Sequence, residues 1–333
     1  MRQVQVTRFG GPEVLMASEG PDPVPRPGQA VVSIFAVHVL FIETQIRRGW
    51  GQEYFSVQPP YVPGDGVAGH VILVGSGVDP GWIGRRVAAR TRERGGYADR
   101  AIVSVEDLIW VPDGLDLREA AALLHDGPTA LALFGNARIE PQERVLVLGA
   151  AGGLGLLLVQ LAHAAGARVI GAARGRRKLE LVREVGADVA VDYSEPDWAE
   201  QVRKATGGAG LDVVFDGAGG AVGEAAFGLT APGARFSAHG APSGGFTDID
   251  AQAAQRLGVT VRGIEQVQFL PAESKRLAER ALAEAAAGRL RPVIGQTFPL
   301  EHAAEAHAAM EARSVIGTTL LLPSGASPSM RPQ

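Results

Sequence analysis

The fold of this chain is decided by residues 144–178, which read RVLVLGAAGGLGLLLVQLAHAAGARVIGAARGRRK. Within them, Arg144–Leu148 is a short apolar run, typical of a strand buried inside a parallel sheet. A glycine-rich turn follows at Gly149–Gly155, then an apolar helix over Leu156–His163 and a second strand at Arg168–Ala172. Strand, turn, helix and strand within about thirty residues predict a βαβ unit.

The turn carries the spacing Ala150-x-Gly152-x-x-Gly155, with alanine at the first of three fingerprint positions. The missing side chain of Gly152 lets the backbone approach a pyrophosphate, and that of Gly155 lets the helix pack closely on the strand. The N–H groups of the first helical turn, including those of Gly153 and Leu154, would face the anion together with the positive end of the helix dipole. Such glycines also occur in ordinary tight turns, but their place between a buried strand and an apolar helix favours dinucleotide binding.

Composition narrows the remaining possibilities. The chain has 333 residues, 46% hydrophobic and 20% charged, which fits a globular protein of two domains. A net charge of −4 gives no basic face for nucleic acid, and the absence of cysteine excludes disulfides, thiol catalysis and thiolate metal sites. Residues 145–167 are uncharged but contain five glycines, Gln160 and His163, so they predict a buried core and not a membrane span. With no apolar signal segment at MRQVQVTRFG, we expect a soluble, cytoplasmic protein.

Residues 1–118 predict an antiparallel, barrel-like β domain, because short alternating strands are separated by Gly and Pro. These strands are expected at Gln3–Thr7, Gln29–Ala36, Gly69–Val74 and Arg86–Arg90.

Residues 119–264 alternate strand and helix and predict a doubly wound parallel sheet, giving an α/β fold overall. Its strands are expected at Arg144–Leu148, Arg168–Ala172, Asp188–Asp192, Leu211–Phe215, Arg235–Ala238 and Val259–Ile264, with further helices at Lys178–Val185 and Pro196–Thr206. Residues 265–333 are expected to return to the first domain, through helices at Ala272–Ala287 and Leu300–Ala312 and strands at Val293–Phe298 and Gly317–Leu322. The tail PSGASPSMRPQ has a disordered composition.

Nine stretches along the chain match a known family. They are FGGPEVL, PGQAVVSIFAV, PGDGVAGHVILVGSGV, GGYADRAIV, VPDGLDLREAAAL, GAAGGLG, GADVAVDY, TFPLEHAAEAHAAME and GTTLLLP. Through them the chain resembles the zinc-free quinone oxidoreductase branch of the medium-chain dehydrogenase/reductase superfamily, over nearly its whole length. The resemblance implies a Rossmann domain at residues 119–264 and a GroES-like catalytic domain made of residues 1–118 and 265–333.

The family's zinc-dependent members differ from this chain at their metal ligands. The resemblance implies a cysteine at the position of Leu40, a histidine at Asp65 and a glutamate at Gly66, and the residues present cannot bind zinc in that way. His70 and His125 are the remaining conceivable ligands, and two are fewer than zinc requires. We therefore expect no metal, which favours reduction of a quinone or an activated C=C–C=O group over alcohol oxidation.

The end of the second Rossmann strand indicates which nicotinamide is used. NAD sites usually place a carboxylate there, whereas residues 171–178 read GAARGRRK, with four cations and no carboxylate. Arg174, Arg177 and Lys178 suit a 2′-phosphate, although a solvated basic helix start is the plainer alternative. The resemblance favours the first interpretation, because Lys178, Tyr193 and Arg313 match the family's 2′-phosphate contacts. We expect NADPH.

Further cofactor contacts are expected from position. By the resemblance, Thr129 matches a residue near the nicotinamide ribose. Gly217, Ala218 and Gly240 lie at the carboxyl ends of strands, where the cofactor crosses the sheet, although ordinary turn chemistry would explain them equally well.

The predicted substrate pocket departs from the family pattern. The resemblance implies asparagine, aspartate and tyrosine at the positions that hold Leu40, Glu43 and Gln45, so we expect a rebuilt pocket lined by Leu40 and Gln45. Hydride transfer needs no nucleophile, and water is one possible proton donor. The candidate side-chain donors are His38, Glu43, Tyr54 and His125. Glu43 could equally be a helix-start carboxylate satisfied by backbone N–H groups.

Together these features predict an NADPH-dependent, zinc-independent reductase of a quinone or α,β-unsaturated carbonyl. Two alternatives stay open: an enoyl reductase of a biosynthetic pathway, and a nicotinamide-binding protein with no turnover. The expected partners are a small-molecule substrate and a second copy of the chain. The second copy would pair through the edge strand Val259–Ile264, unless residues 244–257 shield that edge and leave a monomer.

Overall fold

The computed structural model describes residues 1–52, 55–92 and 94–323. They form two compact units, each with its own sheet. The β-rich unit holds residues 1–125, 278–289 and those from 294 on, and the α/β unit holds residues 126–277 and 290–293. The boundaries that the sequence predicts, after residues 118 and 264, fall earlier in the chain.

The α/β unit is built on one parallel sheet of six strands, in the order β10-β9-β8-β11-β12-β13. The strands are β8 (Arg144–Leu148), β9 (Arg168–Ala173), β10 (Val189–Asp192), β11 (Leu211–Asp216), β12 (Thr230–Ala238) and β13 (Thr260–Arg262). This order confirms the predicted doubly wound sheet. From β8 the chain adds β9 and β10 on one side of the sheet and β11, β12 and β13 on the other, so the strand order reverses at β8. In such sheets the ligand crevice forms at that reversal, outside the carboxyl ends of the strands.

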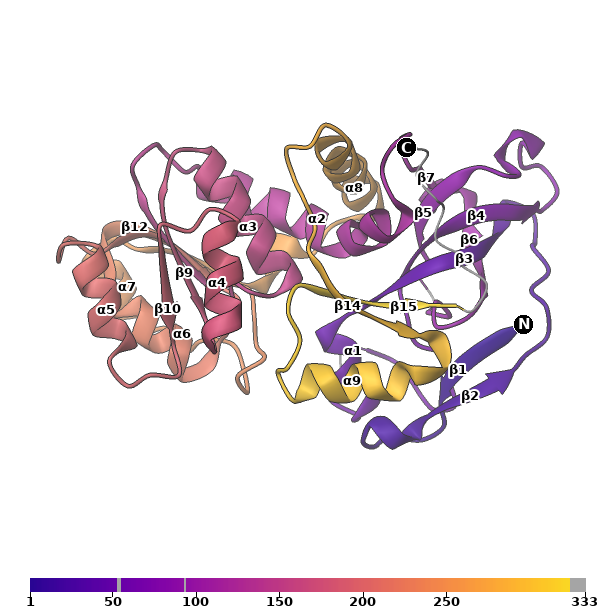
Figure 1. Ribbon diagram of the computed structural model, residues 1–333, viewed down its shortest axis with the longest axis horizontal. Helices are drawn as coiled ribbons and strands as arrows, with labels where there is room; N and C mark the ends of the chain where they lie inside the picture. The colour runs from indigo at the N-terminus through magenta and orange to yellow at the C-terminus, as the bar shows by residue number, and fades with distance from the viewer. Residues whose placement is uncertain (53–54, 93, 324–333) are drawn as a thin grey trace. The chain divides into compact units, whose positions relative to one another are not determined.

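Helices cover both faces of this sheet, with α3 and α4 on one side and α5 and α7 on the other (Figure 1). Their bounds are α3 (Gly153–Ala164), α4 (Arg176–Glu184), α5 (Trp198–Ala205), α6 (Gly220–Phe227) and α7 (Ala251–Leu257). Two more helices, α2 (Leu117–Ala137) and α8 (Pro271–Ala286), each continue across a boundary between the units. With both faces covered, the central strands are apolar throughout, as the residues of β8 from Val145 to Leu148 show by their complete burial.

The glycine turn after β8 brings helix and strand into close backbone contact. A Cβ on Gly155 would lie 2.4 Å from the carbonyl oxygen of Gly149 and 2.8 Å from the Cα of Ala150. Gly149 itself has φ +68°, a conformation that side chains disfavour. The predicted role of Gly155 in close packing is therefore confirmed at the level of distances, and α3 begins at Gly153, before the predicted Leu156.

The β-rich unit has a seven-stranded sheet with the path β14-β15-β3-β4-β5-β7, and β6 also pairs with β3. The bounds are β3 (Gln29–Val39), β4 (Gly66–Val74), β5 (Arg86–Arg90), β6 (Arg100–Ser104), β7 (Ile109–Trp110), β14 (Ile294–Pro299) and β15 (Thr318–Leu322). A separate antiparallel pair joins β1 (Arg2–Val6) and β2 (Leu15–Glu19). All pairs are antiparallel except β14 with β15. The predicted return of the last strands to the first domain is confirmed.

Two helices of the β-rich unit that are far apart in the chain, α1 (Phe41–Arg47) and α9 (Ala303–Glu311), lie side by side (Figure 1). Glu311 binds the buried guanidinium of Arg47 and, at 2.8 Å, that of Arg48. The predicted helix over Leu300–Ala312 is present as a 3₁₀ turn at Leu300–His302 followed by α9. No helix among the described residues has the length and apolarity to cross a membrane.

Replacing Gly155 with alanine should destabilise the α/β unit, because the new methyl group would press on backbone atoms that cannot rotate away. We expect Gly155→Ala to lower the free energy of unfolding by about 1–3 kcal/mol. Gly135→Ala is the matched control in helix α2, since a Cβ there would have no neighbouring atom within 4 Å and alanine is the better helix former. Chemical denaturation of both variants checks this, and equal stability of the two would contradict it.

Candidate cofactor and substrate sites

The turn between β8 and α3 presents unpaired backbone donors. Gly152 precedes the helix with φ −80° and ψ 167° and no side-chain cap, so the first helical N–H groups have no acceptor within the helix. Gly152 is exposed and Gly153 and Leu154 are half-buried, which leaves these donors accessible. An anion at this helix start would receive hydrogen bonds and the favourable end of the helix dipole.

Cations gather beside the end of β9. Arg174 and Arg177 are exposed and Lys178 is half-buried. Arg176 forms an ion pair with Glu180 at 2.8 Å. The guanidinium of Arg174 lies 5.3 Å from the ring centre of Tyr193. Of the four predicted cations, Arg176 is ion-paired with Glu180, and the exposed Arg174 and Arg177 are accessible to an anionic ligand.

A carboxylate that the sequence does not single out organises this corner. Asp192 ends β10 opposite Ala173 of β9, and its Oδ2 accepts a hydrogen bond from the Gly175 N–H at 2.8 Å. Its Oδ1 accepts from the Ser194 N–H at 2.9 Å. Burial acts to raise the pKa of Asp192, but these hydrogen bonds and the charge of Arg174 hold it below its ordinary value. Asp192 thus stays ionised and fixes the loop that carries Arg174.

A second carboxylate, the buried Asp216, holds the carboxyl ends of β11 and β12 together. Its Oδ1 accepts from the N–H groups of Ala218 at 2.9 Å and Gly219 at 2.8 Å, and its Oδ2 accepts from the hydroxyl of Thr247. Burial raises the pKa of this carboxyl. A Cβ on Gly240 would lie 2.3 Å from the carbonyl of Gly217, so the two strand ends touch through bare backbone.

The structure thus brings most of the predicted cofactor residues to one unit. The α/β unit contains the half-buried Thr129 together with Ala150, Gly152, Gly153, Leu154, Gly155, Arg174, Arg177, Lys178, Tyr193, Gly217, Ala218 and Gly240. Arg313 belongs to the β-rich unit, where it has φ +57° and its guanidinium lies 5.1 Å from the ring centre of Phe41. Their cofactor roles stay predictions.

In the β-rich unit, two of the candidate proton donors lie close together. His38 on β3 is buried and His125 in α2 is half-buried with its Nε2 enclosed, and their ring centres lie 6.2 Å apart. Burial lowers the pKa of His38 to about 3, with a further contribution from His125, and burial lowers that of His125 to about 4. Both imidazoles are therefore neutral at neutral pH.

Glu43 lies in a different buried cluster. Its Oε2 accepts from the Leu40 N–H at 3.1 Å and the Tyr97 hydroxyl at 2.9 Å, and its Oε1 accepts from the Gly64 N–H at 2.7 Å. The Tyr97 hydroxyl also lies 2.9 Å from Nε2 of His307. The contact with Leu40 is the helix-start arrangement that the sequence offered as the alternative for Glu43.

This cluster has a proton to share. The Tyr97 hydroxyl has one proton but two hydrogen-bond partners, Glu43 and His307. It can donate to only one of them, so the other hydrogen bond needs a proton on the Glu43 carboxyl or on Nε2 of His307. Burial raises the pKa of Glu43 to about 7, against the hydrogen bonds that lower it. Burial lowers the pKa of His307 to about 3. Glu43 is thus the one member of this trio that titrates near neutral pH.

The residues predicted to line the substrate pocket flank the start of α1. Leu40 is half-buried immediately before the helix, and Gln45 is half-buried within it. Tyr54 lies outside the described residues.

The positions at which zinc-dependent relatives hold their metal are occupied by other interactions. Leu40 offers no donor atom, and the Asp65 carboxylate binds the guanidinium of Arg90. Within the described ranges, no group of three or more His, Asp or Glu side chains is arranged to hold a metal ion. The donor set present does not fit zinc.

The raised pKa of Glu43 predicts how its replacement changes stability with pH. Between its ordinary pKa of 4.5 and about 7, the unfolded chain releases this proton and the folded chain keeps it, so the Glu43 contribution to stability falls as pH rises. We expect the stability of wild type minus that of Glu43→Gln to fall by roughly 2–3 kcal/mol from pH 4.5 to 7.5. Exposed Glu195→Gln is the control, with a difference that stays flat. Denaturant titrations across this range test it, and a difference that grows with pH would refute it.

Comparison with known proteins agrees with this geometry. Residues 26–113 match the family model described as the alcohol dehydrogenase GroES-like domain, and residues 153–283 match the one described as zinc-binding dehydrogenase. The quinone oxidoreductase of Sus scrofa is 32% identical over 97% of this chain and 98% of its own length. The 2-haloacrylate reductase of a Burkholderia species is 33% identical over 96% of this chain and 98% of its own.

Solved structures give the same result. A mycobacterial protein in complex with NADPH superposes with a TM-score of 0.86 at 32% identity, covering 97% of this chain and all of that chain. Both halves of the chain, and its whole length, therefore match one family of oxidoreductases. The chain belongs to the quinone oxidoreductase branch of the medium-chain dehydrogenase/reductase superfamily.

Proposed function

We propose that this protein is an NADPH-dependent, zinc-independent reductase of quinones or α,β-unsaturated carbonyl compounds. The observation that carries the proposal is the position of the glycine turn at Gly149–Gly155. The turn follows β8, where the strand order β10-β9-β8-β11-β12-β13 reverses, and it lies in the same unit as the cations that follow β9. The mycobacterial relative solved with NADPH supports this choice of cofactor.

The residues of the α/β unit fit a dinucleotide phosphate. The N–H groups at Gly153–Gly155 would hold the pyrophosphate, and Arg174, Arg177 and Lys178 would hold the 2′-phosphate. The hydrogen bonds of Asp192 support this assignment. Its two carboxylate oxygens accept from the N–H groups of Gly175 and Ser194, so Asp192 is engaged by the backbone and is not assigned to the ribose 2′-hydroxyl of NADH. Bound NADPH would supply a hydride to the substrate.

The substrate class follows from what the β-rich unit lacks. The alcohol-oxidising members use zinc to stabilise negative charge on oxygen, and Leu40 with the ion-paired Asp65 cannot hold that metal. An enone or quinone delocalises the developing charge onto its own carbonyl oxygen and depends less on a Lewis acid. The name of the Burkholderia relative, 2-haloacrylate reductase, also describes reduction of a conjugated C=C bond.

Reduction of a quinone or an enone also needs a proton. His38 and His125 are neutral at pH 7 and so are weak proton donors. Glu43 has the better pKa, about 7, but its oxygens are engaged by Leu40, Gly64 and Tyr97. We propose that water supplies the proton, or that Glu43 does so through Tyr97. A cytoplasmic location is part of the same proposal.

A substrate panel tests the function. Purified protein is assayed for NADPH consumption with quinones, simple enones and enoyl thioesters, each before and after exhaustive chelation. We expect turnover of quinones or enones that chelation leaves unchanged. Turnover confined to enoyl thioesters would establish the enoyl reductase alternative, and NADPH binding without turnover would establish the binding-protein alternative. Loss of activity on chelation, restored by zinc, would refute metal independence.

Cofactor selectivity gives a sharper test at one residue. We expect NADPH to bind at least tenfold more tightly than NADH, since a charge-assisted hydrogen bond contributes about 1.5–3 kcal/mol. Lys178→Ala should weaken NADPH by about tenfold and leave NADH nearly unchanged. Lys204→Ala is the control, because α5 ends at the opposite edge of the sheet from the strands' carboxyl ends. Fluorescence titration of the three proteins with each cofactor gives the six affinities, and a preference of the wild type for NADH would overturn the assignment.

We also propose that the protein is a homodimer joined through β13. This strand is at the edge of the sheet, and all three of its residues are exposed, Val261 by 39%. An exposed apolar edge strand favours pairing with another chain, and two copies related by a two-fold axis would satisfy both edges.

Replacing the apolar residue Val261 at the centre of β13 with a charged one should separate the subunits. In antiparallel pairing about its middle residue, Val261→Lys would place two like charges directly opposite each other, which is destabilising. We expect light scattering to give twice 34.7 kDa for wild type and 34.7 kDa for the variant. The same substitution at Val24, a side chain 78% exposed in the β-rich unit, should leave the dimer intact. A wild-type mass near 34.7 kDa would exclude the dimer.

A further inference from the structure

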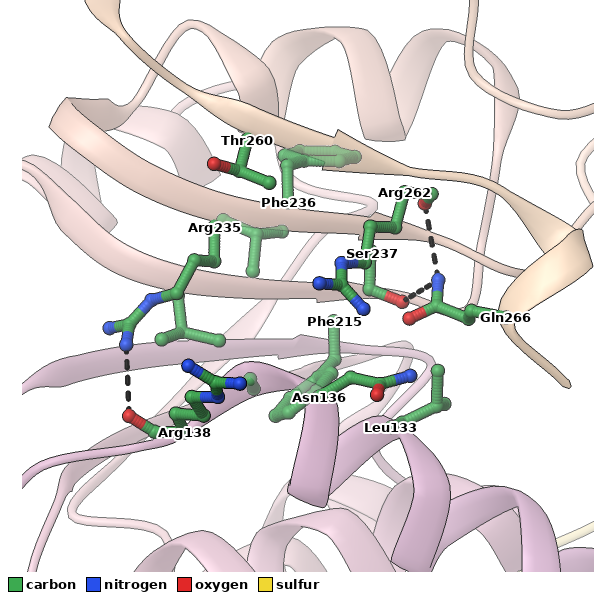
Figure 2. A pocket seen from close by; sticks show the side chains of 13 residues that line it. Leu133, Asn136, Arg138, Phe215, Arg235, Phe236, Ser237, Thr260, Arg262 and Gln266 are labelled. Atoms are coloured by element: carbon green, nitrogen blue, oxygen red, sulfur yellow. Dashed lines mark hydrogen bonds between the residues drawn. The ribbon is translucent and has the colours of Figure 1, made fainter.

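A second cationic region of the α/β unit lies away from the glycine turn, on the face of the sheet towards the end of α2. The register pairs Val213 with Arg235 and Arg235 with Thr260, and likewise Phe215 with Ser237 and Ser237 with Arg262. Side chains of paired residues lie on the same face of a sheet. The last turn of α2 covers part of this face with Leu133 and Asn136 and leaves a cavity of about 210 Å³ (Figure 2).

Three guanidinium groups, those of Arg138, Arg235 and Arg262, line this cavity (Figure 2). Arg235 is held in place, because it donates to the carbonyl of Arg138 at 2.9 Å and binds the carboxylate of Glu143. Across the described part of the chain, Arg138 and Arg262 have no carboxylate at ion-pairing distance. Two positive charges therefore face the cavity uncompensated.

Three carboxylates on the segments that carry the lining residues have other partners. Asp212 binds Arg144 through both oxygens, at 2.7 Å each. The carboxylate of Glu265 accepts a hydrogen bond from the N–H of Gly263 at 2.8 Å. With Glu143 taken by Arg235, each of these three carboxylates already has a partner, and none of them neutralises Arg138 or Arg262.

The floor of the cavity is polar and ordered. Ser237 is buried, and its hydroxyl receives a hydrogen bond from the Gln266 amide at 2.9 Å. That amide also donates to the carbonyl of Gly263 at 2.8 Å, which fixes the chain just after Arg262. Asn136 and Thr260 add an amide and a hydroxyl that can donate to a ligand.

From this arrangement we propose that the cavity is a binding site for a phosphate dianion, either free phosphate or the phosphoryl group of a monoester. Two unpaired guanidinium groups match two negative charges, and their N–H forks suit tetrahedral phosphate oxygens. At about 210 Å³ the cavity is large enough for a phosphoryl group. The residues that line it, among them Thr260 and Arg262 of the edge strand β13, are distinct from the cations that follow β9.

Calorimetric titration with inorganic phosphate, at ionic strength held constant with chloride, tests the proposal. We expect binding that weakens at least tenfold in Arg262→Gln and in Arg138→Gln, since each removes a charge-assisted contact. Exposed Arg168→Gln, on β9 of the same sheet, is the control and should bind as wild type does. Melting temperatures of all variants establish that they fold, and Arg262→Lys should retain part of the affinity.

Lys178→Ala separates this site from the proposed cofactor site. Unchanged phosphate affinity in Lys178→Ala, with loss in Arg262→Gln, supports the proposal whatever the outcome of the NADPH titrations. The reverse pattern would place the bound phosphate at the cofactor site and overturn it. Binding no stronger than that of acetate, or none at all, would also overturn it. Tighter binding of methyl phosphate than of inorganic phosphate would identify a phosphate ester as the ligand, and the opposite order the free ion.

Discussion

The close backbone approach between α3 and the turn after β8 is the constraint on which the α/β unit depends. With 2.4 Å between a hypothetical Cβ at Gly155 and the carbonyl of Gly149, only glycine permits this packing. The same approach aims the first N–H groups of α3 at the edge of the sheet where its strand order reverses. Packing and ligand binding therefore depend on the same missing side chain, so a change that relaxes one also alters the other.

Two carboxylates, the buried Asp216 and the half-buried Asp192, fix the backbone at the ends of other strands. Asp216 satisfies the N–H groups of Ala218 and Gly219 and binds Thr247, while Asp192 holds Gly175 and Ser194. A buried N–H without a partner is costly, so these side chains replace the hydrogen bonds that the strands lose where they end. The loops around the proposed cofactor site are thereby fixed by the chain's own acids before any ligand binds.

Long apolar strands and the glycine turn can be predicted from the sequence because their burial and spacing are local properties. The start of helix α1 is only an open alternative in the sequence, since the nonpolar Leu40 stands where a capping side chain is usual and Glu43 reaches back from within the helix instead. The trio of Glu43, Tyr97 and His307 escapes sequence reasoning for a different reason: its members are 54 and 210 residues apart, and only the fold joins them. The role of Asp192 escapes it because this carboxylate comes from the neighbouring strand.

In the β-rich unit, the residues predicted to stand at the metal positions of zinc-dependent relatives make other interactions. Asp65, at a position where zinc-dependent relatives bind metal, is neutralised by Arg90. Leu40 contributes no polar side chain, and only its backbone N–H remains to be satisfied, by Glu43. His38 and His125 stay neutral because burial lowers their pKa values, so they impose no charge on the interior at neutral pH. Such a site would stabilise little negative charge on a substrate oxygen, and for that reason we propose a substrate that carries its own electron-accepting carbonyl.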